Sequence, residues 1–270
     1  MVTNKIYNES CLDTMSRMPE GFIDLTVTSP PYDNLRTYEQ GIDETWGESI
    51  WKPIIRELYR VTKDGGVVVW IVNDATINGS ETCTSFKQAI FAVECGFRLH
   101  DTMIWQKNSP PLTHNRYEQH FEYMFVFSKG RPKSFNPIYE NRSYVDKRTH
   151  KSYRRNKDGN GFDIGFVGSD NKKMICNVWG IRVGYGLVTA DTIAHQHPAI
   201  FPEKLAADHI TSWSNEGDLV YDPFMGSGTT AKMAHILNRK WIGSETSQKY
   251  CNLAEKRLQP YLQQTNLYHQ

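Results

Sequence analysis

The sequence has few cysteines, no long apolar run and almost no net charge. Its five cysteines lie far apart and form no Cys-x-x-Cys pair, which disfavours a disulfide framework and a cysteine-rich zinc site. The longest unbroken apolar run, Val67–Val72, has six residues, far fewer than the roughly 20 needed to cross a bilayer. The polar start MVTNKIYNES also lacks the apolar segment of a secretory signal. We therefore expect a soluble, cytoplasmic protein that makes no membrane contact.

The formal charge of +1 conceals one basic segment. Residues 131–175 hold eleven Lys or Arg and five Asp or Glu, so this segment carries +6 and the remainder carries −5. A local basic segment on a nearly neutral chain suggests a polyanionic partner, and a solvated surface loop is the alternative.

Hydrophobic periodicity predicts strands that alternate with helices in the two outer parts of the chain. We expect strands at 22–28, 66–72, 98–106, 120–128, 219–221 and 240–243, and helices at 46–61, 82–95, 203–213, 229–237 and 248–258. This alternation predicts an α/β fold with a doubly wound, mostly parallel sheet. Because the periodicity disappears in the middle, we expect residues 131–176 to form an insertion between the halves 1–130 and 177–270.

A glycine-containing turn, residues 222–230 (DPFMGSGTT), lies between a predicted strand and a predicted helix. Gly226 and Gly228 permit a positive φ and a close approach of the backbone to a ligand. Glu245, at the end of the next strand, is placed where doubly wound folds bind ribose hydroxyls. The turn lacks the lysine of a Walker A loop but formally fits a dinucleotide fingerprint, and a turn without a ligand stays an alternative.

A Ser-Pro-Pro-Tyr turn, residues 29–32, directly follows the predicted strand at 22–28, at the end of the strand where open α/β sheets carry their sites. The two prolines fix φ and remove two backbone donors, which leaves the Ser29 hydroxyl and the Pro30 carbonyl as a rigid pair of acceptors. Tyr32 adds an aromatic face. This set suits an exocyclic amine on a planar ring, since the amine donates two hydrogens and the ring can stack. A proline-stiffened loop with no ligand is the alternative.

Together the two turns resemble those of the amino-group DNA methyltransferases that use S-adenosylmethionine, in the β order, where the catalytic motif precedes the cofactor motif. Residues 28–32 resemble their catalytic motif, and residues 222–229 resemble their cofactor loop. Residues 105–111 and 120–123 are similar to the strand pair beneath the flipped-base pocket, 197–204 to the segment over the cofactor's methionine end, and 243–245 to the acidic ribose turn. The resemblance covers the chain outside 131–176, where that family has its target-recognition region.

The resemblance implies a Rossmann-like methyltransferase fold, double-stranded DNA as partner and S-adenosylmethionine as cofactor, with no metal. The implied catalytic residues are Ser29, Pro30, Pro31 and Tyr32, and the implied cofactor-binding residues are Asp222, Pro223, Phe224, Gly226, Ser227, Gly228, Thr229, Glu245, His197 and Pro198. For DNA phosphates we select Arg142, Lys147, Arg148, Lys151, Arg154 and Arg155. A homodimer and a cognate restriction endonuclease for the same DNA site stay open.

The expected product is N4-methylcytosine in a flipped-out base, with N6-methyladenine as the alternative. Family members with Ser-Pro-Pro-Tyr lean towards cytosine, and Ser10 stands where many relatives carry an aspartate that holds adenine, so that Glu9 or Asp13 would have to substitute for it. Methylation of cytosine carbon 5 is disfavoured because the motifs contain no cysteine nucleophile. An NAD-dependent dehydrogenase, a non-catalytic DNA-binding module and a methyltransferase for RNA or protein amines remain the more distant alternatives.

Overall fold

The computed structural model describes residues 1–31, 46–108, 116–142, 151–166 and 171–265. The chain divides into two compact units. The first consists of Met1–Asn136 and Asn177–Gln270, and the second of Pro137–Cys176. Each unit is described by itself below.

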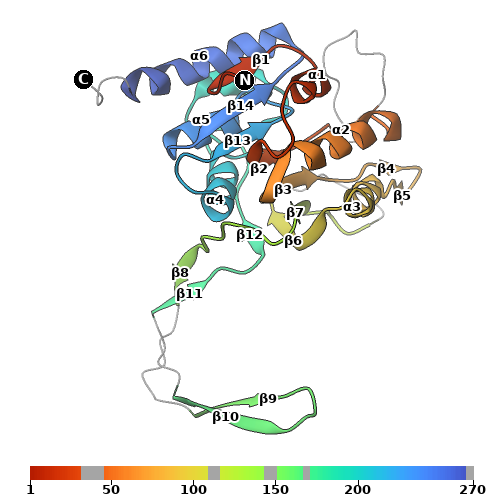
Figure 1. Cartoon of the computed structure of the whole chain (residues 1–270), viewed down its shortest axis with the longest axis vertical. Helices are drawn as coiled ribbons and strands as arrows, with labels where there is room; N and C mark the ends of the chain where they lie inside the picture. Colours follow the sequence, from red (N-terminus) through yellow and green to blue (C-terminus); the bar gives the residue numbers. More distant parts are fainter. Residues whose placement is uncertain (32–45, 109–115, 143–150, 167–170, 266–270) are drawn as a thin grey trace. The chain divides into compact units, whose positions relative to one another are not determined.

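The first unit is built on an eight-stranded sheet with the order β1-β14-β13-β2-β3-β7-β6-β12 (Figure 1). Its strands are β1 (Lys5–Tyr7), β2 (Ile23–Thr28), β3 (Thr62–Val72), β6 (Arg98–Gln106), β7 (Phe121–Ser128), β12 (Val178–Gly180), β13 (Leu219–Asp222) and β14 (Lys240–Ser244). Neighbouring strands run parallel except at β7, which is antiparallel to both β3 and β6. The start of β7 therefore lies at the same sheet edge as the carboxyl ends of the other strands.

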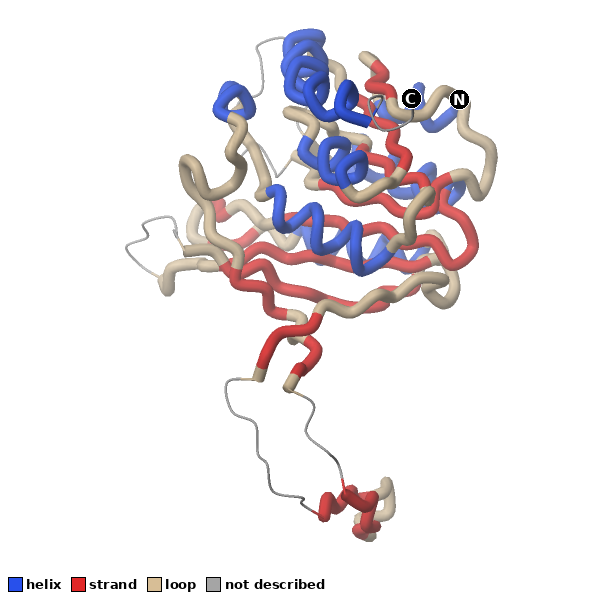
Figure 2. Tube along the Cα trace, turned by 90° about the vertical axis from the view of Figure 1, so that its left-hand side faces the viewer, coloured by secondary structure: helices blue, strands red, loops and turns tan. Residues whose placement is uncertain are grey.

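In the described part of the chain, the α-helices α1 to α6 cover the two faces of this sheet (Figures 1 and 2). One group consists of α1 (Cys11–Ser16), α2 (Glu48–Val61) and α3 (Thr84–Glu94), and the other of α4 (Glu203–Trp213), α5 (Thr229–Ile236) and α6 (Gln248–Thr265). A hairpin of β4 (Thr76–Ile77) and β5 (Ser80–Glu81) follows β3, and a short 3-10 helix, η1 (Thr192–Gln196), precedes α4. The predicted doubly wound, mostly parallel α/β fold is confirmed.

The central strands are apolar because helices cover them on both sides. Every residue of β2 is buried, and the run Val67–Val72 in β3 is buried throughout. Such strands show no polar alternation, as expected for a covered parallel sheet. In α2 the buried side chains recur at helical spacing, at Trp51, Ile54, Ile55, Leu58 and Val61, so this helix places one apolar face against the sheet.

The second unit contains two antiparallel strand pairs. β8 (Tyr139–Asn141) pairs with β11 (Lys172–Met174), and β9 (Lys151–Arg155) pairs with β10 (Gly161–Phe166). The sequence shows no strand periodicity here because exposed strands have no apolar face to bury; all residues of β8 and β11 are exposed. The first unit includes Asn136, whose side chain donates to the carbonyls of Thr211 and Ser214 at 3.1 and 3.0 Å.

The largest difference from the expected elements is at the C-terminal helix. We expected this helix to end at Leu258, before Pro260, but α6 continues to Thr265. Proline removes one backbone hydrogen bond from a helix. Tertiary contacts hold the helical turn after Pro260. The Tyr261 carbonyl contacts His235 Nε2 at 3.2 Å, and the Tyr261 hydroxyl donates to Asp191 at 3.1 Å. Within the described residues, no helix is both long enough and apolar enough to cross a membrane.

Candidate active site

The two motif turns lie side by side at the carboxyl edge of the sheet. The Ser-Pro-Pro turn follows β2, the glycine turn follows β13, and these strands are parallel neighbours paired at Val220 with Leu25. The hydroxyl of Thr28, the last residue of β2, donates to Asp222 Oδ1 at 2.7 Å, across 194 residues of sequence. A second contact joins the Thr230 hydroxyl in α5 to the carbonyl of Val27 at 3.1 Å. These two hydrogen bonds hold the turns together.

The Ser-Pro-Pro turn is only partly accessible to solvent. Thr28 and Pro30 are buried, while Ser29 and Pro31 are half-buried. Tyr32, the expected stacking residue, lies outside the described residues. The described part therefore presents a hydroxyl and a proline-restricted backbone at the site edge.

The glycine turn needs its glycines for two separate reasons. Gly226 and Gly228 have φ of 50° and 80°, in the left-handed region that favours glycine. A Cβ at Gly226 would also lie 2.9 Å from His197 Nε2. The His197 ring is buried and packs against Tyr250 at a centroid distance of 4.3 Å. The histidine expected over the cofactor site thus lies directly against the turn, whereas the neighbouring Pro198 is exposed.

Glu245 follows β14, the strand next to β13 in the sheet. Its Oε2 accepts the N–H of Gly226 and its Oε1 accepts the N–H of Ser247, both at 2.9 Å. The backbone of Glu245 is held from the N-terminal segment, since its N–H donates to the Tyr7 carbonyl at 3.0 Å and its carbonyl accepts from Asn8 at 2.9 Å. The acid therefore lies at the glycine turn, where the sequence placed it.

Asp222 is a fully buried carboxylate with one incompletely used oxygen. Its Oδ1 accepts from Thr28 and from the Phe224 N–H, at 2.7 and 3.0 Å. Its Oδ2 is buried and finds no hydrogen-bond partner among the described residues. Burial raises the pKa of Asp222 to about 6, and the hydrogen bond from Thr28 only partly opposes this rise. A buried acceptor without a partner suits a donor supplied by a ligand.

Two tryptophans that the sequence did not single out surround Phe224. Its ring lies 5.6 Å from that of Trp46 and 6.2 Å from that of Trp70, both edge-on. Trp105 and Trp179 are buried elsewhere, in β6 and β12, and Trp105 Nε1 donates to the Ile181 carbonyl at 2.8 Å. The sequence alone does not show which tryptophans lie near Phe224, because all four lie in or beside regular elements.

The strand pair expected to support a base pocket also reaches this edge, where β6 ends and β7 begins. Lys107, after β6, forms an ion pair with Glu122 of β7 at 2.7 Å. Beside the start of β7 lies a cavity of about 320 Å³, lined by Glu81, Arg116, Tyr117, Glu118, Gln119, Phe121 and Tyr123. Aromatic walls with several polar side chains are suited to a planar, hydrogen-bonding group.

The N-terminal segment contains Ser10 and the two acids, Glu9 and Asp13, that could substitute for the missing aspartate. Ser10 caps α1, since its hydroxyl accepts the Leu12 N–H at 3.2 Å. The Glu9 carboxylate pairs with Arg17 and accepts the Thr14 hydroxyl at 2.8 Å, and the hydrogen bond from Arg17 lowers the pKa of Glu9. Asp13 is exposed in the first turn of α1.

The residues selected for DNA contact belong to the second unit or lie outside the description. Arg142 is exposed and directly follows β8. Lys151, Arg154 and Arg155 lie on β9, and Lys147 and Arg148 fall in a segment outside the described residues.

Known proteins are similar to this chain in sequence and in fold. The N6/N4 family model, described as DNA methylase, matches residues 23–256. The orphan methyltransferase M.BamHII of Bacillus amyloliquefaciens is 53% identical over 249 residues, which cover 89% of this chain and 90% of that protein. The PvuII DNA methyltransferase (cytosine-N4-specific) superposes with a TM-score of 0.70 at 20% identity, over 95% of this chain and 86% of the other. M1.HpyAVI, solved in complex with S-adenosylmethionine, gives 0.61 at 22% identity over 94% and 98%. The chain therefore belongs to the N6/N4 family of DNA methylases, enzymes that use S-adenosylmethionine to methylate an exocyclic amino group in DNA.

Proposed function

We propose that this enzyme methylates the N4 amino group of cytosine in double-stranded DNA. The observation that supports methyl transfer to an amine is the 2.7 Å hydrogen bond between Thr28 and Asp222, because it holds the proposed amine-binding turn against the proposed cofactor turn. Ser29 at the start of the catalytic motif and Ser10 in place of an acid favour cytosine over adenine. The fold relative named as cytosine-N4-specific supports the same choice.

The residues at the glycine turn fit S-adenosylmethionine. This molecule carries an amino acid end, which has N–H donors, and a ribose with two hydroxyls. Asp222 supplies a buried oxygen that has no hydrogen-bond partner among the residues that the structure describes, and the positive φ of Gly226 and Gly228 lets the backbone approach a ligand closely. Glu245, which accepts the Gly226 N–H in this structure, is the acceptor suited to ribose. His197, Phe224 and the remaining turn residues Pro223, Ser227 and Thr229, with Pro198 beside His197, complete the proposed cofactor site.

The catalytic turn prepares the amine. When bound, S-adenosylmethionine would supply an electrophilic methyl group on its sulfonium sulfur, and that sulfur would keep the electron pair of the carbon–sulfur bond when the methyl group moves to the amine nitrogen. The Ser29 hydroxyl and the Pro30 carbonyl accept the two amine hydrogens, which favours a tetrahedral nitrogen and aims its lone pair at the methyl carbon. Methyl transfer leaves the nitrogen with one proton too many. This proton is released to solvent, and the Ser29 hydroxyl and the Pro30 carbonyl act only as hydrogen-bond acceptors. Pro31 stiffens the turn and Tyr32 stacks on the base, which must leave the duplex to reach the site.

The second unit is proposed as the target-recognition region. It carries nine Lys or Arg and five Asp or Glu between Pro137 and Cys176, which gives +4. Arg142, Lys147, Arg148, Lys151, Arg154 and Arg155 are the proposed phosphate contacts.

A homodimer belongs to the same proposal. The side chains of Phe86, Ile90 and Val93 are exposed on one side of α3. Lys87 and Glu94 lie near the two ends of this apolar side, so two antiparallel copies of α3 would place opposite charges together. Light scattering at two protein concentrations tests this association.

A further proposed partner is a restriction endonuclease that cuts the DNA site which this enzyme methylates. The proposed place of action is the cytoplasm. Relatives named type II methyltransferases support a role in restriction and modification. To test for the endonuclease, cell extract is incubated with unmethylated DNA and with DNA that this enzyme has methylated. Only the unmethylated DNA should be cut.

The decisive experiment is nucleoside mass spectrometry. Unmodified DNA is incubated with the enzyme and methyl-labelled S-adenosylmethionine, with Ser29→Ala and Ser16→Ala in parallel. We expect labelled N4-methylcytosine from the wild type and from Ser16→Ala, since Ser16 is an exposed residue of α1. Ser29→Ala loses an amine acceptor, so its rate should fall about 100-fold, while its affinity for S-adenosylmethionine stays unchanged.

Two results would contradict parts of this proposal. Labelled N6-methyladenine would keep the mechanism and reject cytosine as the target. Full activity of Ser29→Ala would reject the role of the Ser-Pro-Pro turn.

A further inference from the structure

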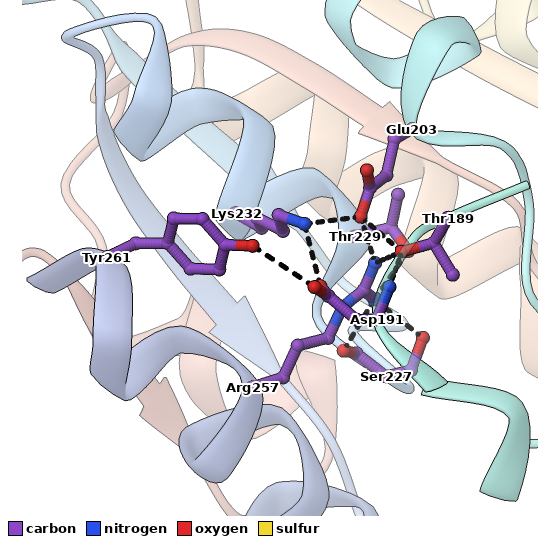
Figure 3. A network of polar contacts seen from close by, with 8 residues as sticks. All are labelled: Thr189, Asp191, Glu203, Ser227, Thr229, Lys232, Arg257 and Tyr261. Carbon is purple, nitrogen blue, oxygen red and sulfur yellow. Dashed lines mark hydrogen bonds and ion pairs between the residues drawn. The ribbon is translucent and has the colours of Figure 1, made fainter. Parts of the chain in front are cut away.

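A partly buried network of charged and hydroxyl side chains lies beside the glycine turn (Figure 3). Its members are Thr189, Asp191, Glu203, Ser227, Thr229, Lys232, Arg257 and Tyr261. They come from the loop before η1, the start of α4, the glycine turn with α5, and α6. Two carboxylates face two cations, and the side chains of Arg257 and Lys232 are 0% and 4% exposed.

Arg257 is the member that contacts the glycine turn most extensively. Its Nη1 donates to the Ser227 carbonyl and to the Thr229 hydroxyl, both at 3.0 Å, and to the Ser227 hydroxyl at 3.2 Å. The same guanidinium donates through Nε to Asp191 at 2.9 Å and through Nη2 to Glu203 at 2.6 Å. One rigid planar group therefore joins the turn to two carboxylates on other segments.

The position of Ser227 makes these contacts relevant to the cofactor. Ser227 lies between Gly226 and Gly228, and glycines give a backbone wide conformational freedom that must be lost before a ligand binds. The hydrogen bond from Arg257 to the Ser227 carbonyl restricts the backbone at the centre of the turn. A restrained turn accepts a ligand without an ordering cost at the moment of binding.

Lys232 supplies the second positive charge next to the two carboxylates of the network. Its Nζ donates to Asp191 at 2.6 Å and to Glu203 at 2.7 Å, so the two carboxylates are balanced by two cations. Burial alone would raise the pKa of Asp191, but the hydrogen bonds from Lys232 and Arg257 lower it. The carboxylates are thus held ionised as fixed partners for Arg257.

We propose that Arg257 is a positioning residue for S-adenosylmethionine. Through Ser227 it holds the glycine turn in its binding shape, and through Asp191 and Glu203 it ties the turn to the segment that carries His197. Arg257 lies one residue beyond the segment 23–256 that the family model matches. The inference rests on the proposed role of the glycine turn in binding the cofactor.

The test compares Arg257, which is buried, with Arg239, which is half-buried. Arg257→Gln and Arg257→Lys remove the guanidinium fork from the turn, whereas Arg239→Gln removes a guanidinium that binds Ser214 and the Leu237 carbonyl, near the amino end of β14. Calorimetric titration with S-adenosylmethionine and S-adenosylhomocysteine should show about tenfold or greater loss of affinity in both Arg257 variants, since charge-assisted hydrogen bonds that order the turn are lost. Arg239→Gln should lower Tm but bind both molecules like the wild type.

Hydrogen exchange and kinetics separate positioning from stability. Amides of residues 226–229 should exchange faster in Arg257→Gln than in Arg239→Gln, and KM for S-adenosylmethionine should rise while KM for DNA stays unchanged. Should Arg257→Gln not fold, Asp191→Asn is a milder variant that weakens one partner of Arg257 and should raise the Kd about threefold.

The outcomes distinguish this inference from the proposed function. Wild-type affinity in a folded Arg257→Gln with reduced Tm would assign the residue to stability alone and reject the inference. A wild-type enzyme that binds neither molecule would reject the proposed cofactor site itself.

Discussion

Asp222 shows how one buried side chain can link folding to ligand binding. Its Oδ1 receives the hydroxyl of Thr28, while its Oδ2 has no partner in the described part of the chain. Burial raises its pKa to about 6, from 3.8 in the unfolded chain. The folded protein therefore holds the proton more tightly than the unfolded chain. The contribution of this group to stability is complete below pH 3.8 and is lost as the pH rises through 6.

At the residue scale we predict a pH-dependent effect of Asp222→Asn on the ligand-free enzyme. The asparagine does not ionise, so the free energy of unfolding of the variant, relative to wild type, should increase between pH 4 and pH 7. The increase should approach about 3 kcal/mol, the energy equivalent of the pKa difference. Urea unfolding at several pH values measures it. Parallel stability curves for the two proteins would show that the carboxyl titrates normally.

At the scale of elements, the strand-to-helix turn after β13 depends on packing as much as on backbone conformation. Gly226 has a positive φ, and a Cβ there would also meet His197 Nε2 at 2.9 Å. Gly217 has a φ of 83° but open space around its missing Cβ. The two glycines therefore separate backbone strain from a steric clash.

We predict that Gly226→Ala weakens S-adenosylmethionine binding about tenfold or more, because the turn or His197 must move. Gly217→Ala is the matched control. Both variants should lose about 1 kcal/mol of stability from the left-handed backbone, but only Gly226→Ala should change the affinity. Chemical denaturation and calorimetric titration give the two quantities. Equal affinities for the cofactor would place the ligand away from this turn.

Several elements were predictable because their periodicity is strong. The helix Glu203–Trp213 and the strand Arg98–Gln106 have the predicted bounds. β1 and α1 were missed since three and six residues are too few to show a period. β12 was missed as well. It has only three residues, and the second unit separates it in the sequence from β6, the strand with which it pairs.

At the scale of the molecule, the chain divides into a larger unit that contains the proposed cofactor site and a small basic unit. The Ser-Pro-Pro turn and the glycine turn both lie in the first unit, and Lys151, Arg154 and Arg155 lie in the second. Cofactor affinity and DNA affinity should therefore respond to different substitutions.

We predict that replacing Lys151, Arg154 and Arg155 together by glutamine weakens DNA binding and reduces its salt dependence. If each contacts one phosphate, the slope of log K against log salt should fall by about 3, at ~0.9 for each contact. Fluorescence anisotropy at several salt concentrations measures the slope, and cofactor affinity should not change. Replacing Lys5, Arg98 and Lys240, at the amino ends of β1, β6 and β14, removes equal charge and should leave the slope unaltered. Equal slopes for all three proteins would remove β9 from the DNA interface.

The amino-acid sequence by itself determined the strand and helix pattern, the α/β class, the two turns and the family. These depend on local spacing: Ser-Pro-Pro and Gly-Ser-Gly restrict or free the backbone wherever they occur, and apolar periodicity reports which faces are buried. Only the tertiary structure decided which polar atoms meet. Thr28 reaches Asp222 because β2 and β13 become neighbours, and Arg257 reaches Ser227 because α6 returns over the turn. Such contacts depend on strand order and helix packing, which bring together residues far apart in the chain, and local spacing carries no record of them.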